Sequence, residues 1–110
     1  MVYVSITGLQ LKSVRHAPAF WWHAIRSMAQ AQAAPGNISA TARRIDGVHH
    51  TLTVWDSEAA MRTYLTNGPH LAAMRAFRGM ATGKTLGFLA EAAPDWDKAH
   101  ALWLKSSRTV

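Results

Sequence analysis

The dipeptide Asp46-Gly47 restricts the fold of this 110-residue chain more than any other feature of the sequence. Both residue types tolerate a positive φ, and such a pair between two β-type segments is typical of a two-residue hairpin turn. Residues 37–45 and 48–55 flank the pair, and both have strand character. The sequence therefore predicts that these two segments pair as antiparallel neighbours in a sheet.

Hydrophobic periodicity predicts the elements before this hairpin. Apolar residues alternate with other residues along residues 2–11, which predicts a strand with a bulge at Gly8. Helical spacing then extends over residues 17–32, with Pro18 in the first turn and Pro35-Gly36 after the end. The helix is expected to bury one stripe of apolar side chains. That stripe consists of Trp21, Trp22, Ile25, Met28 and Ala29.

The residues after the hairpin predict a further helix, a strand and a last helix. The first helix, capped by Asp56 or Ser57, is interrupted near Pro69 and continues as a second segment over residues 70–80. Residues 82–91 alternate as a strand, and the last helix starts at about residue 95. The expected inner faces contain Met61, Tyr64 and Leu65 in the first helix and Trp96, His100 and Trp103 in the last.

The element order is β-α-β-β-α-β followed by a helix. This order is typical of an α+β, ferredoxin-like domain, in which a four-stranded antiparallel sheet carries its helices on one face. The length fits a single domain, residues 1–110. Both faces of several strands carry apolar or uncharged residues, such as Val48, Leu52 and Val54 on one face and Thr51, Thr53 and Trp55 on the other. A second copy packed sheet to sheet would cover the face that the helices leave open, so we expect a homodimer.

The formal net charge of +6 is compatible with a nucleic-acid partner, but the placement of the basic residues argues against one. They are spread along the whole chain, and only Arg43 and Arg44 are adjacent. This pattern is typical of a solvated basic surface, with an anionic small substrate as the alternative. The chain has no cysteine, which excludes disulfides, thiol nucleophiles and zinc-thiolate sites. No apolar run approaches the roughly 20 residues of a membrane span, and the start lacks a signal-peptide pattern, so we expect a cytoplasmic protein without a membrane partner.

His70 is the best single candidate for chemistry. With Pro69 in the first turn of its helix, His70 shares a face with Met74 and Phe77, so its ring is expected to point inward. A histidine in that place must find a hydrogen-bond partner or titrate anomalously. It could act as a general base, bind a phenolic or enolic substrate, or ligate haem. The alternative is a structural histidine bonded to nearby backbone.

Several other side chains are candidates for the wall of a pocket beside His70. His49 and His50 are adjacent in a strand, so their rings point to opposite faces and only one can line the pocket. Neither forms a recognisable metal motif, and no metal site is predicted. Arg75 and Arg78 are expected in solvent, although either could bind a substrate carboxylate or a haem propionate. The expected substrate-binding residues are Trp22, His50, Trp55, Tyr64, Met74 and Phe77.

The stretch TLTVWDSEAAMRTYLTNGPHLAAMRAFRG, residues 51–79, carries a family resemblance. Its strand ending in Val-Trp, its acidic-small cap, its Ala-Met-Arg turns and its Gly-Pro-His sequence resemble the corresponding stretch of spheroidene monooxygenase-type proteins. In element order, the whole chain is similar to the dimeric α+β barrel superfamily, which includes antibiotic biosynthesis monooxygenases.

The resemblance implies a pocket between the sheet and its helices that holds an apolar aromatic or polyene substrate, or haem. Some members oxygenate without a cofactor because the substrate itself activates dioxygen, and others bind haem through a histidine of the second helix. This chain has Tyr64 where the haem-degrading branch typically has tryptophan, and Met74 where that branch has the ligating histidine. Within the matching Gly-Pro-His sequence, His70 would be the haem ligand.

Sequence and resemblance together favour a small monooxygenase-like enzyme with His70 as its working group and with either no cofactor or haem. Its expected partner is a small hydrophobic molecule. Because fold analogy does not carry function by itself, the rival hypothesis is a non-catalytic barrel that binds a hydrophobic ligand or haem.

Overall fold

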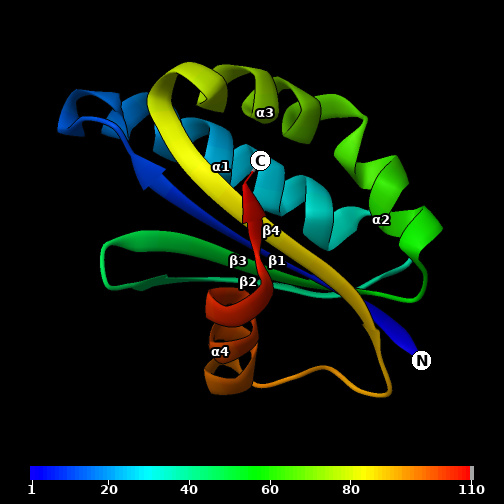
Figure 1. Cartoon of the computed structure of the whole chain (residues 1–110). Coiled ribbons are helices and arrows are strands. Elements are labelled where there is room, and N and C mark those ends of the chain that lie inside the picture. The colour runs from blue at the N-terminus through cyan, green and yellow to red at the C-terminus, as the bar shows by residue number, and fades with distance from the viewer. Residues whose placement is uncertain (110) are drawn as a thin grey trace.

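The computed structural model describes residues 1–109 and shows a layered α+β architecture (Figure 1). Five antiparallel strands form one sheet in the order β2-β3-β1-β4-β5. The elements are β1 (Val2–Leu11), the 3-10 turn η1 (Val14–His16), α1 (Ala17–Ala33), β2 (Asn37–Ile45), β3 (Val48–Trp55), α2 (Glu58–Leu65), α3 (Gly68–Met80), β4 (Ala81–Ala90), α4 (Trp96–Ser106) and β5 (Arg108–Thr109). The predicted βαββαβ order with a C-terminal helix is confirmed. The short edge strand β5 was not expected.

Local signals account for several boundaries of these elements. At the β2–β3 turn, Asp46 and Gly47 have φ values of 52° and 79°, which is the conformation that an Asp-Gly hairpin requires. Ser57 caps α2 by accepting a hydrogen bond from the Ala60 N–H, and Asp95 caps α4 in the same way. The hairpin and both helix starts are thus specified by neighbouring residues.

Helices cover both faces of the sheet. Helices α1, α2 and α3 lie on one face, and α4 lies on the other (Figure 1). On the α4 face, Val4, Ile6 and Leu52 form a buried cluster with Ala99 and Trp103 of α4. The last helix therefore packs on the sheet face that a second copy was expected to cover. Homodimerisation stays a prediction.

Gly8 has a role other than the expected bulge. The pairing of β1 is continuous at Gly8, which lies opposite His50 in β3 and Lys84 in β4. A Cβ atom at Gly8 would collide with the Trp103 indole and lie 2.8 Å from Cε1 of His50. The glycine thus allows Trp103 to approach the strand closely, a contact between distant residues that the local pattern does not reveal.

The prediction of which face of α1 is buried is wrong, because the helix is turned about its axis relative to the expected orientation. Its buried residues are Phe20, Ser27 and Ala31, whereas Trp22 and Ile25 are 55% and 65% exposed. Helix α1 packs beside α3, and Phe20 meets Phe77 of α3 with 5.0 Å between the ring centroids. Of the expected stripe, Trp22 and Ile25 face outward instead.

Candidate functional site

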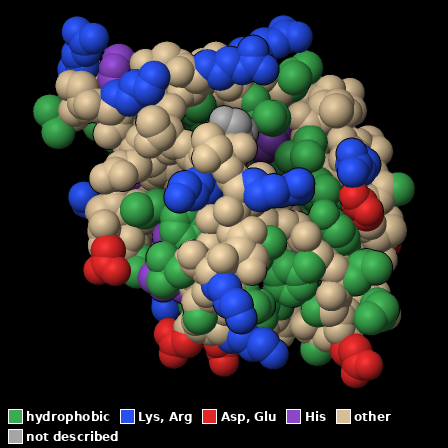
Figure 2. All heavy atoms as spheres, in the orientation of Figure 1, with side chains coloured by type: hydrophobic (Ala, Val, Ile, Leu, Met, Phe, Trp, Pro, Cys, Tyr) green, Lys and Arg blue, Asp and Glu red, His purple; other side chains and the backbone are tan. Residues whose placement is uncertain are grey.

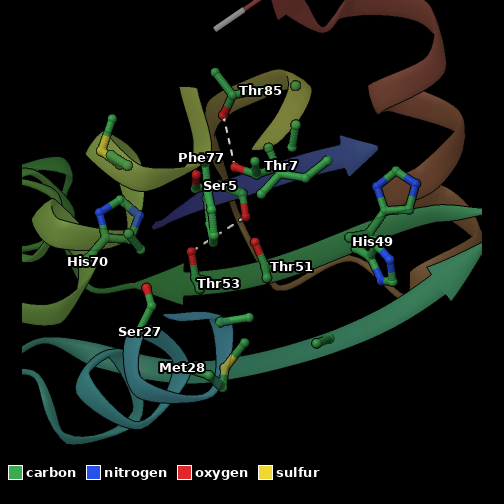
Figure 3. Close-up of a pocket in the computed structure, with 18 of the residues that line it drawn as sticks. Ser5, Thr7, Ser27, Met28, His49, Thr51, Thr53, His70, Phe77 and Thr85 are labelled. Carbon is green, nitrogen blue, oxygen red and sulfur yellow. Dashed lines mark hydrogen bonds between the residues drawn. The ribbon is translucent and has the colours of Figure 1, made fainter. Parts of the chain in front are cut away.

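A cavity of about 520 Å³ lies between the sheet and helices α1 and α3 and also receives residues from α2. Space remains there because the sheet residues beneath it have short hydroxyl side chains instead of large apolar ones (Figure 3). We call these residues the hydroxyl floor: Ser5, Thr7, Thr51, Thr53 and Thr85. The volume falls within the range of small-molecule sites, about 300–1,000 Å³.

The walls above the hydroxyl floor are apolar. Phe20 of α1 and Phe77 of α3 pack against each other with 5.0 Å between their ring centroids. Met28, Met61 and Met74 extend this wall. Methionine side chains adapt to irregular shapes, and the aromatic rings offer flat surfaces. Together with the floor, these walls suit a flat ligand that carries oxygen substituents.

A side chain of α1 holds the backbone of His70. The side chain of Asn67, which precedes α3, makes no capping hydrogen bond. Instead, Oε1 of Gln30 accepts a hydrogen bond from the His70 N–H at 2.7 Å, and Nε2 of Gln30 donates to the Asn67 carbonyl at 2.9 Å. Because the free N–H groups at a helix start need acceptors, Gln30 fixes where α3 begins and therefore where His70 projects.

The ring of His70 has one engaged nitrogen and one open nitrogen. Nδ1 lies 3.2 Å from the Leu65 carbonyl oxygen, which can only accept, so Nδ1 carries the proton and donates. Nε2 is then unprotonated and makes no hydrogen bond within residues 1–109. Burial lowers the pKa of His70, and the bond to Leu65 opposes this only in part. The imidazole is therefore neutral at pH 7 with an open lone pair, as a general base requires.

Tyr64 supports the ring of His70 from α2. The two ring centroids are 4.4 Å apart. The Tyr64 hydroxyl donates to the Ser27 carbonyl at 3.2 Å, and the Ser27 hydroxyl lies 2.8 Å from the phenol oxygen. Since the single phenol proton goes to the carbonyl, Ser27 is the donor in the second bond. Burial raises the pKa of Tyr64, so the phenol stays protonated at neutral pH and acts as a positioning group.

The variant Tyr64→Phe is expected to lose about 1 kcal/mol of unfolding free energy, because Ser27 would lose its buried hydrogen-bond partner while the ring packing remains. Urea unfolding measures the change. Thr63→Ala, at the preceding exposed position of α2, is the control and is expected to stay within about 0.5 kcal/mol of wild type. A Tyr64→Phe variant as stable as the control would contradict the role of this bond.

The adjacent histidines of β3 point to opposite faces, as strand alternation predicts. The His49 ring lies on the cavity side, 4.9 Å from Phe20 and 5.0 Å from Trp21. The His50 ring packs on the α4 side, 4.5 Å from the Trp103 ring. His50 was the histidine expected to bind substrate. It reaches the cavity lining, but its ring contacts lie across the sheet, so His49 is the one whose ring lies on the cavity side.

The structure brings four of the expected site residues together around the cavity: Tyr64, His70, Met74 and Phe77. Two others lie elsewhere, which corrects the prediction. Trp55 is fully buried behind Tyr64, with 5.2 Å between the ring centroids. Trp22 is on the outer face of α1, where the Arg26 guanidinium lies 4.5 Å from its ring. Its neighbour Trp21 lines the cavity instead, because consecutive helical residues project about 100° apart.

Sequence reasoning missed the residues that shape the site from a distance. The hydroxyl floor could have been predicted from the sequence, because Ser5 and Thr7 are two residues apart in one strand and Thr51 and Thr53 are two apart in another, which places each pair on one face of its strand. The role of Gln30 could not, because a glutamine in a helix gives no indication that it caps a helix far along the chain.

Residues 1–109 contain no group of three or more His, Asp or Glu side chains that could hold a metal ion. A haem iron needs only an axial ligand from the protein, and the open Nε2 of His70 fits that requirement. Over the same residues, no helix combines the length and apolar character needed to cross a bilayer.

Comparisons with known proteins identify relatives by structure. The chain matches no protein-family model and no curated protein in sequence. SnoaB, a cofactor-independent oxygenase from Streptomyces nogalater, is 20% identical, with a TM-score of 0.68 over 86% of this chain and 98% of SnoaB. A protein from Nitrosomonas europaea assigned as an antibiotic biosynthesis monooxygenase is 12% identical, with a TM-score of 0.74 over 86% and 94% of the two chains. A similarly assigned protein from Chloroflexus aurantiacus is 14% identical, with a TM-score of 0.66 over 86% and 98%.

Sequence identities of this size concern the fold and not the site. The comparisons agree with the expectation from element order, since nearly the whole length of each of these proteins is matched. The chain therefore shares the ferredoxin-like α+β fold of SnoaB and of the two proteins assigned as antibiotic biosynthesis monooxygenases.

Proposed function

We propose that this protein is a monooxygenase-like enzyme that oxidises a flat, apolar aromatic or polyene substrate in the cavity, with His70 as general base. The observation that carries the proposal is the open Nε2 of a neutral His70 in the wall of an apolar cavity. A reaction without a resident cofactor is supported by the shared fold of SnoaB, a cofactor-independent oxygenase.

The proposed reaction begins with proton removal by His70. Nε2 takes the proton of a phenolic or enolic hydroxyl, and the resulting anion is electron-rich enough to transfer electrons to dioxygen. For a substrate methylene, the balanced change is CH2 + O2 → C=O + H2O. The carbon loses four electrons, and dioxygen accepts them as one carbonyl oxygen and one water. Because the substrate supplies all the electrons, no external reductant is needed.

The surroundings of His70 support this chemistry in two ways. The apolar walls of Phe20, Phe77 and the methionines exclude water from the substrate anion. Hydrogen bonds from water would stabilise this anion and make it a poorer electron donor to dioxygen. The hydroxyls of Ser5 and Thr51 can donate to the oxygen substituents of a flat ring system, and the floor oxygens can accept, which together orient the ring system. The other floor hydroxyls already donate within the sheet.

Oxygen uptake tests the proposal. Purified protein is mixed with a panel of polycyclic phenols and quinols, and the product is analysed by mass spectrometry after reaction under isotopically labelled dioxygen. We expect uptake above the protein-free rate for at least one substrate and one labelled oxygen in its product. A folded protein that gives no uptake with any member of the panel would contradict the proposal.

The hydrogen bond from His70 to Leu65 favours haem binding as a second candidate function. Histidines that bind metals commonly donate their other ring N–H to a carbonyl, as His70 does. Nε2 would then hold the iron, and the haem would supply oxygen activation. A Soret band that is lost in His70→Ala would support this candidate. Colourless protein that binds aromatic ligands and turns none over would support a non-catalytic binding protein.

The pH dependence of kcat/KM is expected to show an acid limb below pH 6.5. Burial lowers the pKa of His70 from its ordinary value of 6.5, so the base is still mostly unprotonated at that pH and is lost on further acidification. Initial rates at low substrate concentration across the acid range measure the limb. A midpoint above 6.5 would contradict the assignment of His70 as the base.

A further inference from the structure

The charged side chains that line the cavity all have one sign. The lining includes three arginines, Arg43, Arg44 and Arg78, and no aspartate or glutamate. Its three histidines, His49, His50 and His70, have pKa values lowered by burial and are uncharged at neutral pH. All six acidic residues of the chain lie outside it, in the β2–β3 turn, at the start of α2 and around the start of α4. The upper edge of the molecule, where α1 and α3 lie, shows Lys and Arg side chains and no acidic ones (Figure 2). The cavity is therefore a region of positive potential that favours anions.

None of the three lining arginines has an acidic partner in the described part of the chain. The guanidinium of Arg43 lies 5.3 Å from the Trp96 ring and is engaged there. Arg44 and Arg78 are exposed, and the only ion pair among residues 1–109 joins Arg62 to Glu58. A free guanidinium presents a planar set of donors that matches a carboxylate in two parallel hydrogen bonds.

The sheet register places Arg44 and Arg78 at one end of the cavity. Arg44 lies opposite His49, and His49 lies opposite Leu9 in β1. Arg78 is in the last turn of α3, and its carbonyl accepts a hydrogen bond from Lys12, which follows β1. This end of the cavity also holds Trp21, which is 47% exposed and packs edge-on against His49. We call it the basic mouth.

His70 lies at the opposite end. Its ring packs on Tyr64, which in turn packs on Trp55 at the far end of β3 (Figure 3 shows His70 and His49 at opposite sides of the cavity). The eight residue steps along α3 from His70 to Arg78 span about 12 Å at the helical rise of 1.5 Å per residue. The hydroxyl floor extends between the two ends. The cavity is thus long, with a base at one end and free positive charge at the other.

We infer that the substrate is an elongated, flat molecule with an anionic group, such as a carboxylate, bound between Arg44 and Arg78 about 12 Å from the atom that His70 deprotonates. The statement about the atom that His70 deprotonates rests on the proposed function. The statement that the substrate carries an anionic group rests only on the charge of the basic mouth. The hydroxyl floor contacts the middle of the molecule, and Phe20 and Phe77 cover its face.

A matched pair of oxidised probes tests this inference without turnover. Anthraquinone-2-carboxylate and anthraquinone-2-carboxamide have the same rings and differ in the charge at one end. Neither is an electron donor to dioxygen, so their binding is independent of the proposed reaction. Isothermal titration calorimetry, supported by quenching of tryptophan fluorescence, gives the two dissociation constants. We expect the carboxylate to bind about tenfold more tightly than the carboxamide in wild type.

Variants locate the source of the preference. The double variant Arg44→Gln/Arg78→Gln is expected to bind both probes equally and to leave the affinity for the carboxamide unchanged. Arg75→Gln is the matched control, since Arg75 is an exposed arginine of the same helix that does not line the cavity. At physiological salt, Arg75→Gln is expected to keep the tenfold preference for the carboxylate over the carboxamide, because the charge of a distant surface arginine is screened there.

Three results would overturn the inference. The two probes could bind wild type equally, neither could bind, or Arg75→Gln could lose as much preference as the double variant. Failure of the proposed function looks different: the charge preference would be present, while no phenol or quinol would cause oxygen uptake.

Discussion

Replacing His70 by glutamine is expected to lower kcat for oxygenation by a factor of about 10²–10⁴, the usual contribution of a general base. A glutamine amide can still donate to the Leu65 carbonyl, to which Nδ1 of His70 donates at 3.2 Å, but it cannot take up a proton at neutral pH. KM is expected to change little, because the walls and the hydroxyl floor remain. Steady-state oxygen uptake with the best substrate of the panel measures both constants.

His23→Gln is the matched control for this substitution. His23 is a half-buried histidine of α1 whose ring contacts Trp22 and Phe77, yet it does not line the cavity. Its kcat is expected to stay within about twofold of wild type. Equal losses in both variants would indicate a structural cause. Retention of wild-type kcat in His70→Gln would contradict the role of His70 as base.

Chemical rescue separates the proton transfer from the packing of the ring. His70→Ala leaves a space beside Tyr64 at the cavity wall, and free imidazole added to this variant can occupy it. Restored activity is expected to need neutral imidazole, so it should increase with pH through the imidazole pKa. A variant whose activity is restored equally by a non-basic ring of the same size would argue for a purely structural histidine.

The elements that were predicted from the sequence are those specified by neighbouring residues. Asp46-Gly47 reverses the chain, Ser57 and Asp95 cap helices, and strand alternation separates His49 from His50. Each of these signals acts over at most a few residues. Because the element order follows from such signals, the fold class could be predicted although no sequence relative identifies it.

The parts that were not predicted depend on residues far apart in the chain. The inner face of α1 was assigned to Trp21, Trp22, Ile25, Met28 and Ala29, but the contact of Phe20 with Phe77 in α3 and the bond from Ser27 to Tyr64 bury Phe20, Ser27 and Ala31. Gln30 caps α3 across 40 residues. The basic mouth joins Arg44 and Arg78, which are scattered in sequence and which sheet register and helix length bring to one end of the cavity. Periodicity contains no information on such contacts.

Replacing Trp103 by alanine is expected to cost about 3–5 kcal/mol of unfolding free energy, a large part of the 5–15 kcal/mol typical of a domain. The indole is 8% exposed, belongs to the cluster with Val4 and Ile6, and donates from Nε1 to the Lys84 carbonyl at 2.9 Å. Gly8 leaves no Cβ that could fill the resulting space. Chemical unfolding followed by circular dichroism measures the loss.

Leu104→Ala is the control, because Leu104 follows Trp103 in α4 and is 64% exposed. Its cost is expected to be within about 0.5 kcal/mol. A large cost for Trp103 with a small cost for Leu104 means that α4 packs on its own sheet through one face. The reverse order would mean that α4 is turned differently, with Leu104 buried against another surface such as a second copy.

The same variant reveals how acid acts on the buried His50. Burial, and then repulsion from His100, lowers the pKa of His50 in the folded protein below the ordinary 6.5 that it regains on unfolding. The unfolded chain therefore binds more protons as pH falls below 6.5, and stability decreases over that range while it is unaffected above it. Without Trp103, water reaches the His50 ring and its pKa moves back toward 6.5. The slope of unfolding free energy against pH is then expected to be shallower in Trp103→Ala than in wild type. An unchanged slope would mean that the acid sensitivity comes from His49 and His70, because burial lowers the pKa of these two histidines as well.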